Sequence, residues 1–161
     1  MKKITVLFVC MGNICRSPTA EAVFRRALER SGLAEHVEVD SAGTDAYHVG
    51  QAPDSRAQRA ALKRGYDLSR IRARKVLAQD FECFDLILAV DKPVLASLRR
   101  QCPSNYADRL ALLMAYAPPS SAQEIGDPYY GGPQGFEVVL DQIEAATEGL
   151  IALLKKTLRI P

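Results

Sequence analysis

The chain has 161 residues, of which 48% are hydrophobic and 25% charged, and its 21 basic and 19 acidic side chains give a formal net charge of +2. A length of about 100 to 200 residues is that of one ordinary domain, so we expect residues 1–161 to form a single domain. This composition excludes intrinsic disorder and fibrous repeats. The even charge balance argues against a nucleic-acid binder, so anions must be attracted by local groups.

The apolar segments are too short for membrane insertion, which takes about 18 or more consecutive apolar residues. The first of them follows Lys3 and reaches only Cys10 before Gly12 interrupts it. We therefore expect a cytoplasmic protein without membrane insertion. In a reducing compartment the four cysteines stay free, which directs attention to thiol chemistry.

The first predicted unit is a strand followed by a helix. Residues 4–9 form a near-continuous apolar run, typical of a strand buried on both faces of a parallel sheet. The helix is predicted to have Ser17 as its N-cap, Pro18 as its first residue and Gly32 just beyond its end. Apolar side chains recur along it at helical spacing, with Glu21 and other charged residues on the opposite face.

A second unit repeats this order, and a third strand follows. Residues 37–41 alternate as a strand does, and residues 42–43 turn out of it. Asp54 then caps a helix that Gly65 closes. Residues 84–90 are a second buried-strand run.

The remaining elements are a short helix, a weak strand, a loop and a long helix. Asp91 precedes a short helix up to about Arg100, and after a polar connection residues 109–113 form the fourth strand. Residues 117–135 are rich in Pro, Gly and Ser and predict a long loop. From Phe136 onward the apolar spacing is that of a final amphipathic helix.

This alternation predicts an α/β fold, with a four-stranded parallel sheet flanked by helices on both faces. In such folds ligands bind beyond the carboxyl ends of the strands. The loop of residues 10–16, between strand 1 and its helix, lies at that edge. It is therefore the predicted phosphate-binding loop.

The chemistry of this loop follows from the sequence Val-Cys-Met-Gly-Asn-Ile-Cys-Arg-Ser-Pro, residues 9–18. Gly12 and Asn13 tolerate positive φ and let the loop curl, so that its N–H groups point inward at the positive end of a helix. Such a nest binds a tetrahedral dianion, and Arg16 adds a bidentate fork. The same field favours a thiolate at Cys10, which makes it the candidate nucleophile.

A phosphoryl transfer also needs a general acid for the leaving group. Asp127 is the candidate, because it stands in the Gly-Asp-Pro-Tyr-Tyr segment of the long loop. Pro128 stiffens the backbone beside it, and Tyr129 and Tyr130 are expected to form a wall for an aromatic substrate. Both candidate residues, Cys10 and Asp127, also have a purely structural interpretation. Asp127 before Pro128 could serve only to cap a turn. A lone cysteine after a strand, such as Cys10, is more often a packed core residue than a nucleophile.

Together these motifs resemble the low-molecular-weight protein tyrosine phosphatases. The resemblance rests on V-C-M-G-N-I-C-R-S-P near the start and D-P-Y-Y about 115 residues later. It extends through the segments S-A-G-T at 41–44, A-R at 73–74, D-F at 80–81 and F-D at 84–85, and through Asp91, and so covers essentially the whole chain.

One position departs from the family pattern. Ile71 stands where many members carry a histidine, so we expect a water or a neighbouring side chain to supply the hydrogen bond that the histidine would make.

The resemblance implies a role for each matching residue. Cys10 would become phosphocysteine, Arg16 would bind phosphate, and Asp127 would act as acid and then as base. The other loop positions are Met11, Gly12, Asn13, Ile14, Cys15 and Ser17. Asn13, Ser17 and Ser41 would brace the loop, with Ser17 donating to the thiolate, while Cys15 would form a reversible disulfide with Cys10 and Tyr47 would add to the substrate wall.

The predicted function is that of a protein-tyrosine phosphatase that needs no cofactor or metal ion. Its expected partner is a phosphotyrosine protein, such as a tyrosine kinase, and the chain is expected to be a monomer or a weak dimer.

Two alternative functions remain. A thiol-dependent arsenate reductase would need a close pair of further cysteines, whereas Cys83 and Cys102 are 19 positions apart. A non-catalytic phosphotyrosine-binding module would need neither Cys10 nor Asp127. We predict surface positions for His36 and His48 and no catalytic role for either.

Overall fold

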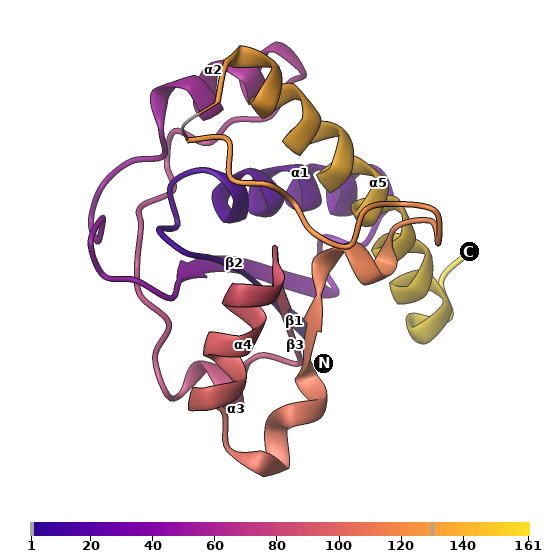
Figure 1. Ribbon diagram of the computed structural model, residues 1–161. Coiled ribbons are helices and arrows are strands. Elements are labelled where there is room, and N and C mark those ends of the chain that lie inside the picture. Colours follow the sequence, from indigo (N-terminus) through magenta and orange to yellow (C-terminus); the bar gives the residue numbers. More distant parts are fainter. Residues whose placement is uncertain (1, 130) are drawn as a thin grey trace.

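A computed structural model describes residues 2–129 and 131–161. Its centre is a four-stranded, fully parallel sheet with the strand order β2-β1-β3-β4 (Figure 1). The strands are β1 (Ile4–Cys10), β2 (Val37–Gly43), β3 (Leu86–Ala89) and β4 (Leu110–Leu112). The predicted α/β fold is therefore confirmed, with the first strand at the centre of the sheet.

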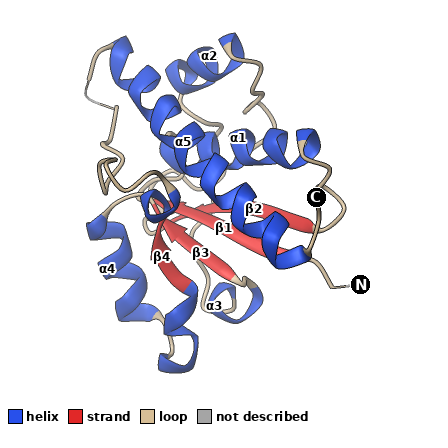
Figure 2. Cartoon of the chain, turned by 90° about the vertical axis from the view of Figure 1, so that its right-hand side faces the viewer, coloured by secondary structure: helices blue, strands red, loops and turns tan. Residues whose placement is uncertain are grey.

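The helices form a layer on each face of the sheet (Figure 2). One layer contains α1 (Arg16–Arg30), α2 (Ser55–Lys63) and α5 (Pro133–Leu158). The other contains α3 (Asp80–Cys83) and α4 (Lys92–Gln101), and two 3-10 helices, η1 (Ser104–Arg109) and η2 (Leu113–Tyr116), flank β4. No helix in the described residues is long and apolar enough to cross a membrane.

The central position of β1 explains its composition. Residues 6–10 of this strand are all buried, because helices cover both faces of the sheet. On the face toward α1, Phe8 packs edge-on against Phe24 with 5.4 Å between ring centroids. Burying one such ring contributes about 2 kcal/mol to stability. The end of β1, which carries Cys10, is thus part of the buried core.

Helix α1 begins earlier than predicted. Its N-cap is Cys15, with no side-chain capping bond, so Ser17 and Pro18 are the second and third residues of the helix. The prediction that Ser17 caps the helix was wrong because its hydroxyl lies 2.9 Å from the Cys10 thiol instead. Glu21, predicted to lie on the exposed face, is only 6% exposed.

Other boundaries shifted as well. Residues 42–43 continue strand β2 because they pair with the end of β1, so the predicted turn there was wrong. The last helix starts three residues before Phe136, at Pro133, and neither α3 nor η1 was predicted. The cap predicted at Asp54 is confirmed, and Asp91 also caps its helix.

Gly149 in α5 offers a test of how closely that helix packs. A Cβ at this position would lie 1.8 Å from the carbonyl oxygen of Tyr116. Alanine in place of glycine ordinarily stabilises a helix by about 0.5–1 kcal/mol. Here we expect Gly149→Ala to lower the free energy of unfolding by about 2–3 kcal/mol, measured by urea denaturation, because the helix must move away.

Gly135→Ala in the same helix is the matched control. Its Cβ would meet Pro128 at an ordinary contact distance of 3.4 Å. We expect no loss of stability from that change. Equal stability of the Gly149→Ala protein and the wild type would contradict the close packing of α5 on η2.

Candidate active site

The phosphate loop, defined here as residues 11–15, joins the end of β1 to the start of α1 and lies over the end of β2. A Cβ at Gly43 would lie 2.6 Å from the carbonyl oxygen of Met11, so only glycine permits this approach. The N–H of Asp45 donates to the same oxygen at 2.9 Å. Asn13 takes a left-handed conformation with φ of 57°. Gly12 does not have positive φ, contrary to expectation. A Cβ at Gly12 would instead lie 3.0 Å from Cδ2 of the His48 ring.

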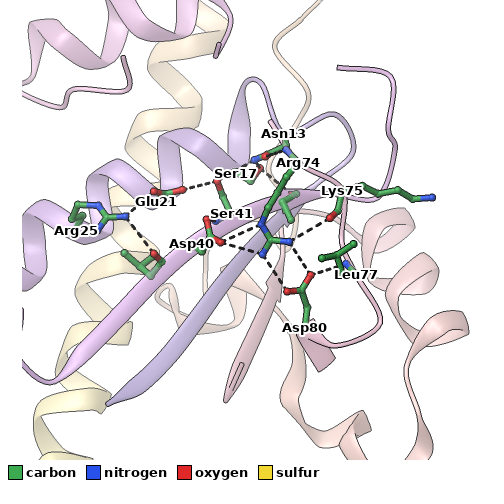
Figure 3. A network of polar contacts seen from close by, with 12 residues as sticks. Asn13, Ser17, Glu21, Arg25, Asp40, Ser41, Arg74, Lys75, Leu77 and Asp80 are labelled. Carbon is green, nitrogen blue, oxygen red and sulfur yellow. Dashed lines mark hydrogen bonds and ion pairs between the residues drawn. The ribbon is translucent and has the colours of Figure 1, made fainter. Parts of the chain in front are cut away.

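Asn13 is the centre of the hydrogen bonds that hold this loop (Figure 3). The backbone N–H of Arg74 donates to its Oδ1 at 3.0 Å. Its Nδ2 donates to Ser17 Oγ at 2.8 Å and to Ser41 Oγ at 3.0 Å. Because a backbone N–H can only donate, the orientation of the Asn13 amide is fixed, and both hydroxyls must accept from it.

This orientation also decides where the two hydroxyl hydrogens point. Ser41 donates to Glu21 Oε1 at 2.7 Å. Ser17 has the Cys10 sulfur at 2.9 Å and the Ala42 carbonyl at 3.4 Å, so the sulfur is the better acceptor. The backbone N–H of Asn13 also donates to that sulfur, at 3.2 Å. Two donor groups, the Ser17 hydroxyl and the Asn13 N–H, therefore converge on the Cys10 sulfur.

The outer part of the network balances buried charge. Arg25 Nη2 lies 2.7 Å from Glu21 Oε2, so the buried carboxylate is paired. Arg74 is held by Asp40 at 3.1 Å and by Asp80 at 3.0 Å. Burial lowers the pKa of Arg74, but the bonds to these two carboxylates outweigh it and raise the pKa overall.

Ile71, where many family members carry a histidine, borders the outer side of this network. It is half-buried and lines a cleft of about 550 Å³ together with Glu21 and Arg25. Ser41 nevertheless has a hydrogen-bond acceptor, because Glu21 reaches it from α1. The Ser41 hydroxyl is therefore satisfied by a side chain from α1.

Arg16 begins α1 and is buried beside Cys10, with 4% of its surface exposed. Its Nη1 donates to Asp91 Oδ2 at 2.6 Å and to the Ile125 carbonyl at 2.9 Å. Nη2 lies 3.7 Å from Asp127 Oδ2. Within residues 2–129 and 131–161 no hydrogen bond uses its Nε–Nη2 edge, which is the bidentate edge that binds oxyanions.

A cleft of about 310 Å³ opens above Cys10. Its lining residues are Cys10, Met11, Gly12, Ile14, Cys15, Arg16, Asp45, Tyr47, His48, Asp127 and Tyr129. The structure thus brings together every predicted catalytic residue and most of the predicted loop residues. Asn13 and Ser17 lie beneath the cleft, and Ser41 lies behind them.

The aromatic rim of the cleft is only partly as expected. Tyr47 is 81% exposed and its ring meets the His48 ring edge-on at 4.8 Å. Tyr129 is 38% exposed. Tyr130, the third predicted wall residue, lies outside the described residues. His48 is half-buried in the lining, and His36 is half-buried as well, whereas both were predicted at the surface.

Cys15 differs from Cys10 in its surroundings, although both thiols are free and buried. Burial, and then the negative charge of Asp54, raise the pKa of Cys15 to about 12. Cys15 is therefore a neutral thiol near pH 7. No group of three or more His, Cys, Asp or Glu side chains in the described part of the chain could hold a metal ion.

The comparisons with known proteins agree with this geometry. The family model described as low molecular weight phosphotyrosine protein phosphatase matches residues 5–160. The chain belongs to this family. It is 44% identical over 154 residues to the low molecular weight protein-tyrosine-phosphatase of Streptomyces coelicolor, covering 94% of this chain and 93% of that protein.

Solved structures of the family have the same fold. A protein tyrosine phosphatase from Entamoeba histolytica superimposes with a TM-score of 0.93 at 41% identity, covering 96% of this chain and 99% of that one. YfkJ from Bacillus subtilis gives 0.92 at 37% identity, covering 98% of both chains. The resemblance inferred from the sequence motifs is confirmed.

Sequence reasoning missed several groups that support the site. Asp91 was noted in the family resemblance without a role, yet it binds Arg16 directly. Its position after a buried strand, at the carboxyl edge of the sheet, was a usable signal. Arg74 was also noted in the resemblance without a role, whereas Glu21 had no such signal, because a charged residue on a helix usually faces solvent. His48 had none either.

The raised pKa of Cys15 can be tested by alkylation. At pH 8 a thiol with a pKa of about 12 is ionised in roughly one molecule in 10⁴. We expect iodoacetamide to modify exposed Cys83 in native Cys10→Ser protein while leaving Cys15 intact, as measured by mass spectrometry of peptides. Unfolding in guanidinium should make both react alike. Equal reactivity of the two cysteines in the native protein would contradict the assigned environment.

Proposed function

We propose that this chain is a protein-tyrosine phosphatase that hydrolyses phosphotyrosine in two steps through a phosphocysteine on Cys10. The observation that carries the proposal is the convergence of the Asn13 N–H and the Ser17 hydroxyl on the Cys10 sulfur, at 3.2 Å and 2.9 Å. A buried sulfur with two donors, at the floor of an open cleft, is suited to attack as a thiolate.

The phosphate dianion would bind above this sulfur. In the described chain no internal hydrogen bond uses the N–H groups of Gly12, Ile14, Cys15 and Arg16, which stand in the loop and at the helix start. These are the orphan donors that bind anions at a helix N-terminus. The Nε–Nη2 edge of Arg16 would hold two further oxygens, while Asp91 fixes the guanidinium from its other side.

In the first step the Cys10 sulfur attacks phosphorus in line with the tyrosine oxygen. The S–P bond forms as the P–O bond breaks, and Asp127 gives its proton to the departing oxygen. Asp127 also lines the cleft, with its carboxylate oxygen 3.7 Å from Arg16 Nη2. In the second step Asp127 accepts a proton from water, which attacks phosphorus and releases phosphate and the thiolate.

The rim supports an aromatic phosphoester as substrate. Tyr47 and Tyr129 border the cleft and offer ring faces to a tyrosine side chain. We propose that the substrate is a phosphotyrosine protein, such as a tyrosine kinase. We also propose that this single-domain protein acts in the cytoplasm as a monomer or weak dimer. Under oxidation Cys10 and Cys15, which both line the cleft, would form the reversible disulfide.

The alternatives receive no support from the site. The cleft lining contains Cys10 and Cys15 but neither Cys83 nor Cys102, so no further thiols stand ready to reduce an arsenate adduct. A module that only binds phosphotyrosine would not require donors aimed at the sulfur.

The nucleophile is tested by substitution. We expect the wild type to hydrolyse 4-nitrophenyl phosphate in excess EDTA, because protein groups supply the nucleophile and the phosphate ligands. Cys10→Ser should show no measurable turnover while it still binds inorganic phosphate, since the loop donors remain. Turnover by Cys10→Ser would exclude the phosphocysteine, and Cys83→Ser with wild-type activity is the matched control.

The acid role of Asp127 is tested by leaving-group dependence. Asp127→Ala should reduce kcat by about 10²- to 10⁴-fold for phenyl phosphate, whose oxygen needs a proton to leave. With 4-nitrophenyl phosphate the loss should be much smaller in single-turnover formation of the phosphoenzyme. An equal loss with both substrates would remove Asp127 from the acid role.

A further inference from the structure

Arg56 is not part of the cleft lining, but it connects the two sides of the site. It lies in the first turn of α2. Its guanidinium carbon is 5.2 Å from the centroid of the Tyr129 ring and 5.0 Å from that of Phe136. Tyr129 lines the cleft, whereas Phe136 is buried near the start of α5. The guanidinium therefore stands between the loop of Asp127 and the helix that follows it.

Asp54 holds this guanidinium in one orientation. Its carboxylate accepts from Arg56 Nε at 3.1 Å and from Nη2 at 2.9 Å, and these hydrogen bonds lower the pKa of Asp54. The backbone N–H of Asp54 donates to the carbonyl oxygen of Ile14 at 2.8 Å. The Asp54–Arg56 pair is thus anchored to the phosphate loop, and it presents a planar cation to two aromatic rings.

The position of Tyr129 is in turn coupled to Asp127. The Tyr129 N–H donates to Asp127 Oδ1 at 3.0 Å, and buried Pro128 joins the two residues. Pro128 packs near Gly135, where an added Cβ would lie 3.4 Å away. A displacement of the Tyr129 backbone would therefore move the Asp127 carboxylate.

We propose that Arg56 is a positioning residue for the general acid, acting through the Tyr129 ring. It sets the distance between the Asp127 carboxyl group and the leaving oxygen above Cys10, by tying the acid's loop to the phosphate loop. The proposal rests on the proposed function. A displacement of about 1 Å at a catalytic group can cost about 10²-fold in rate, so contacts behind the cleft are sufficient to matter.

The test compares two substrates in Arg56→Leu protein. We expect the single-turnover rate of phosphoenzyme formation to fall by about 10- to 100-fold with phenyl phosphate and by less than about threefold with 4-nitrophenyl phosphate, because only the first needs a well-placed acid in this step. Inhibition by inorganic phosphate should change by less than about twofold, since the phosphate loop keeps its own bonds. Arg59→Leu, an exposed arginine one turn along α2, is the matched control and should match the wild type.

Arg56→Lys keeps the charge but loses the planar fork, so it should show the same substrate selectivity with a smaller loss. If Arg56→Leu does not fold, Arg56→Lys provides the same test. An equal change for both substrates, or no change, would overturn the proposal.

A double-mutant cycle tests the route through the ring. If Arg56 acts through Tyr129, then Arg56→Leu should cause no additional loss in Tyr129→Leu protein, and fully additive losses would overturn the proposal. Failure of the proposed function would look different, because the wild type itself would then hydrolyse neither substrate or Cys10→Ser would remain active.

Discussion

The hydrogen bond from the Arg74 backbone N–H to Asn13 Oδ1 orients the hydrogen bonds beneath the candidate nucleophile. It makes the other end of the Asn13 amide a donor toward Ser17 and Ser41. Each hydroxyl then has its own hydrogen left for a different acceptor, and for Ser17 the nearest is the Cys10 sulfur. One main-chain donor, far away in sequence, thus orients the Asn13 amide and leaves the Ser17 hydroxyl hydrogen free to point at the Cys10 sulfur.

The parallel sheet explains why these groups can meet. Strands β1, β2 and β3 all end at the same edge, where Cys10, Gly43 and Asp91 lie at or just beyond their carboxyl ends. The central strand therefore has neighbours on both sides that can support its loop. Gly43 lets the loop lie directly on the end of β2, and Asp91 reaches Arg16 from beyond β3.

Buried charge is the main cost of this arrangement, and the structure offsets it with pairs. Arg16, Glu21 and Asp80 are each at least 94% buried. Asp91, Arg25 and Arg74 are their respective partners. A buried ion without its partner costs several kcal/mol, so the pairs are needed for folding as well as for function. They also leave the loop with little freedom to relax, which suits a site that must hold a phosphate in one orientation.

The amino-acid sequence alone determined the fold class, the loop after the first strand, and the identities of Cys10, Arg16 and Asp127 as candidates. These features depend on apolar periodicity, on helix-start residues and on short motifs, all of which are local in the chain. The partners of those residues were decided by tertiary structure. Glu21, Arg74 and Arg56 look like ordinary surface charges in the sequence, and only packing shows what they contact. Ser17 illustrates the physical reason. A serine at a helix start is expected to cap the helix, but in the folded chain its hydroxyl is bound by Asn13 and Cys10. Asn13 is itself oriented by the distant Arg74 N–H, so a tertiary contact prevails over the local preference.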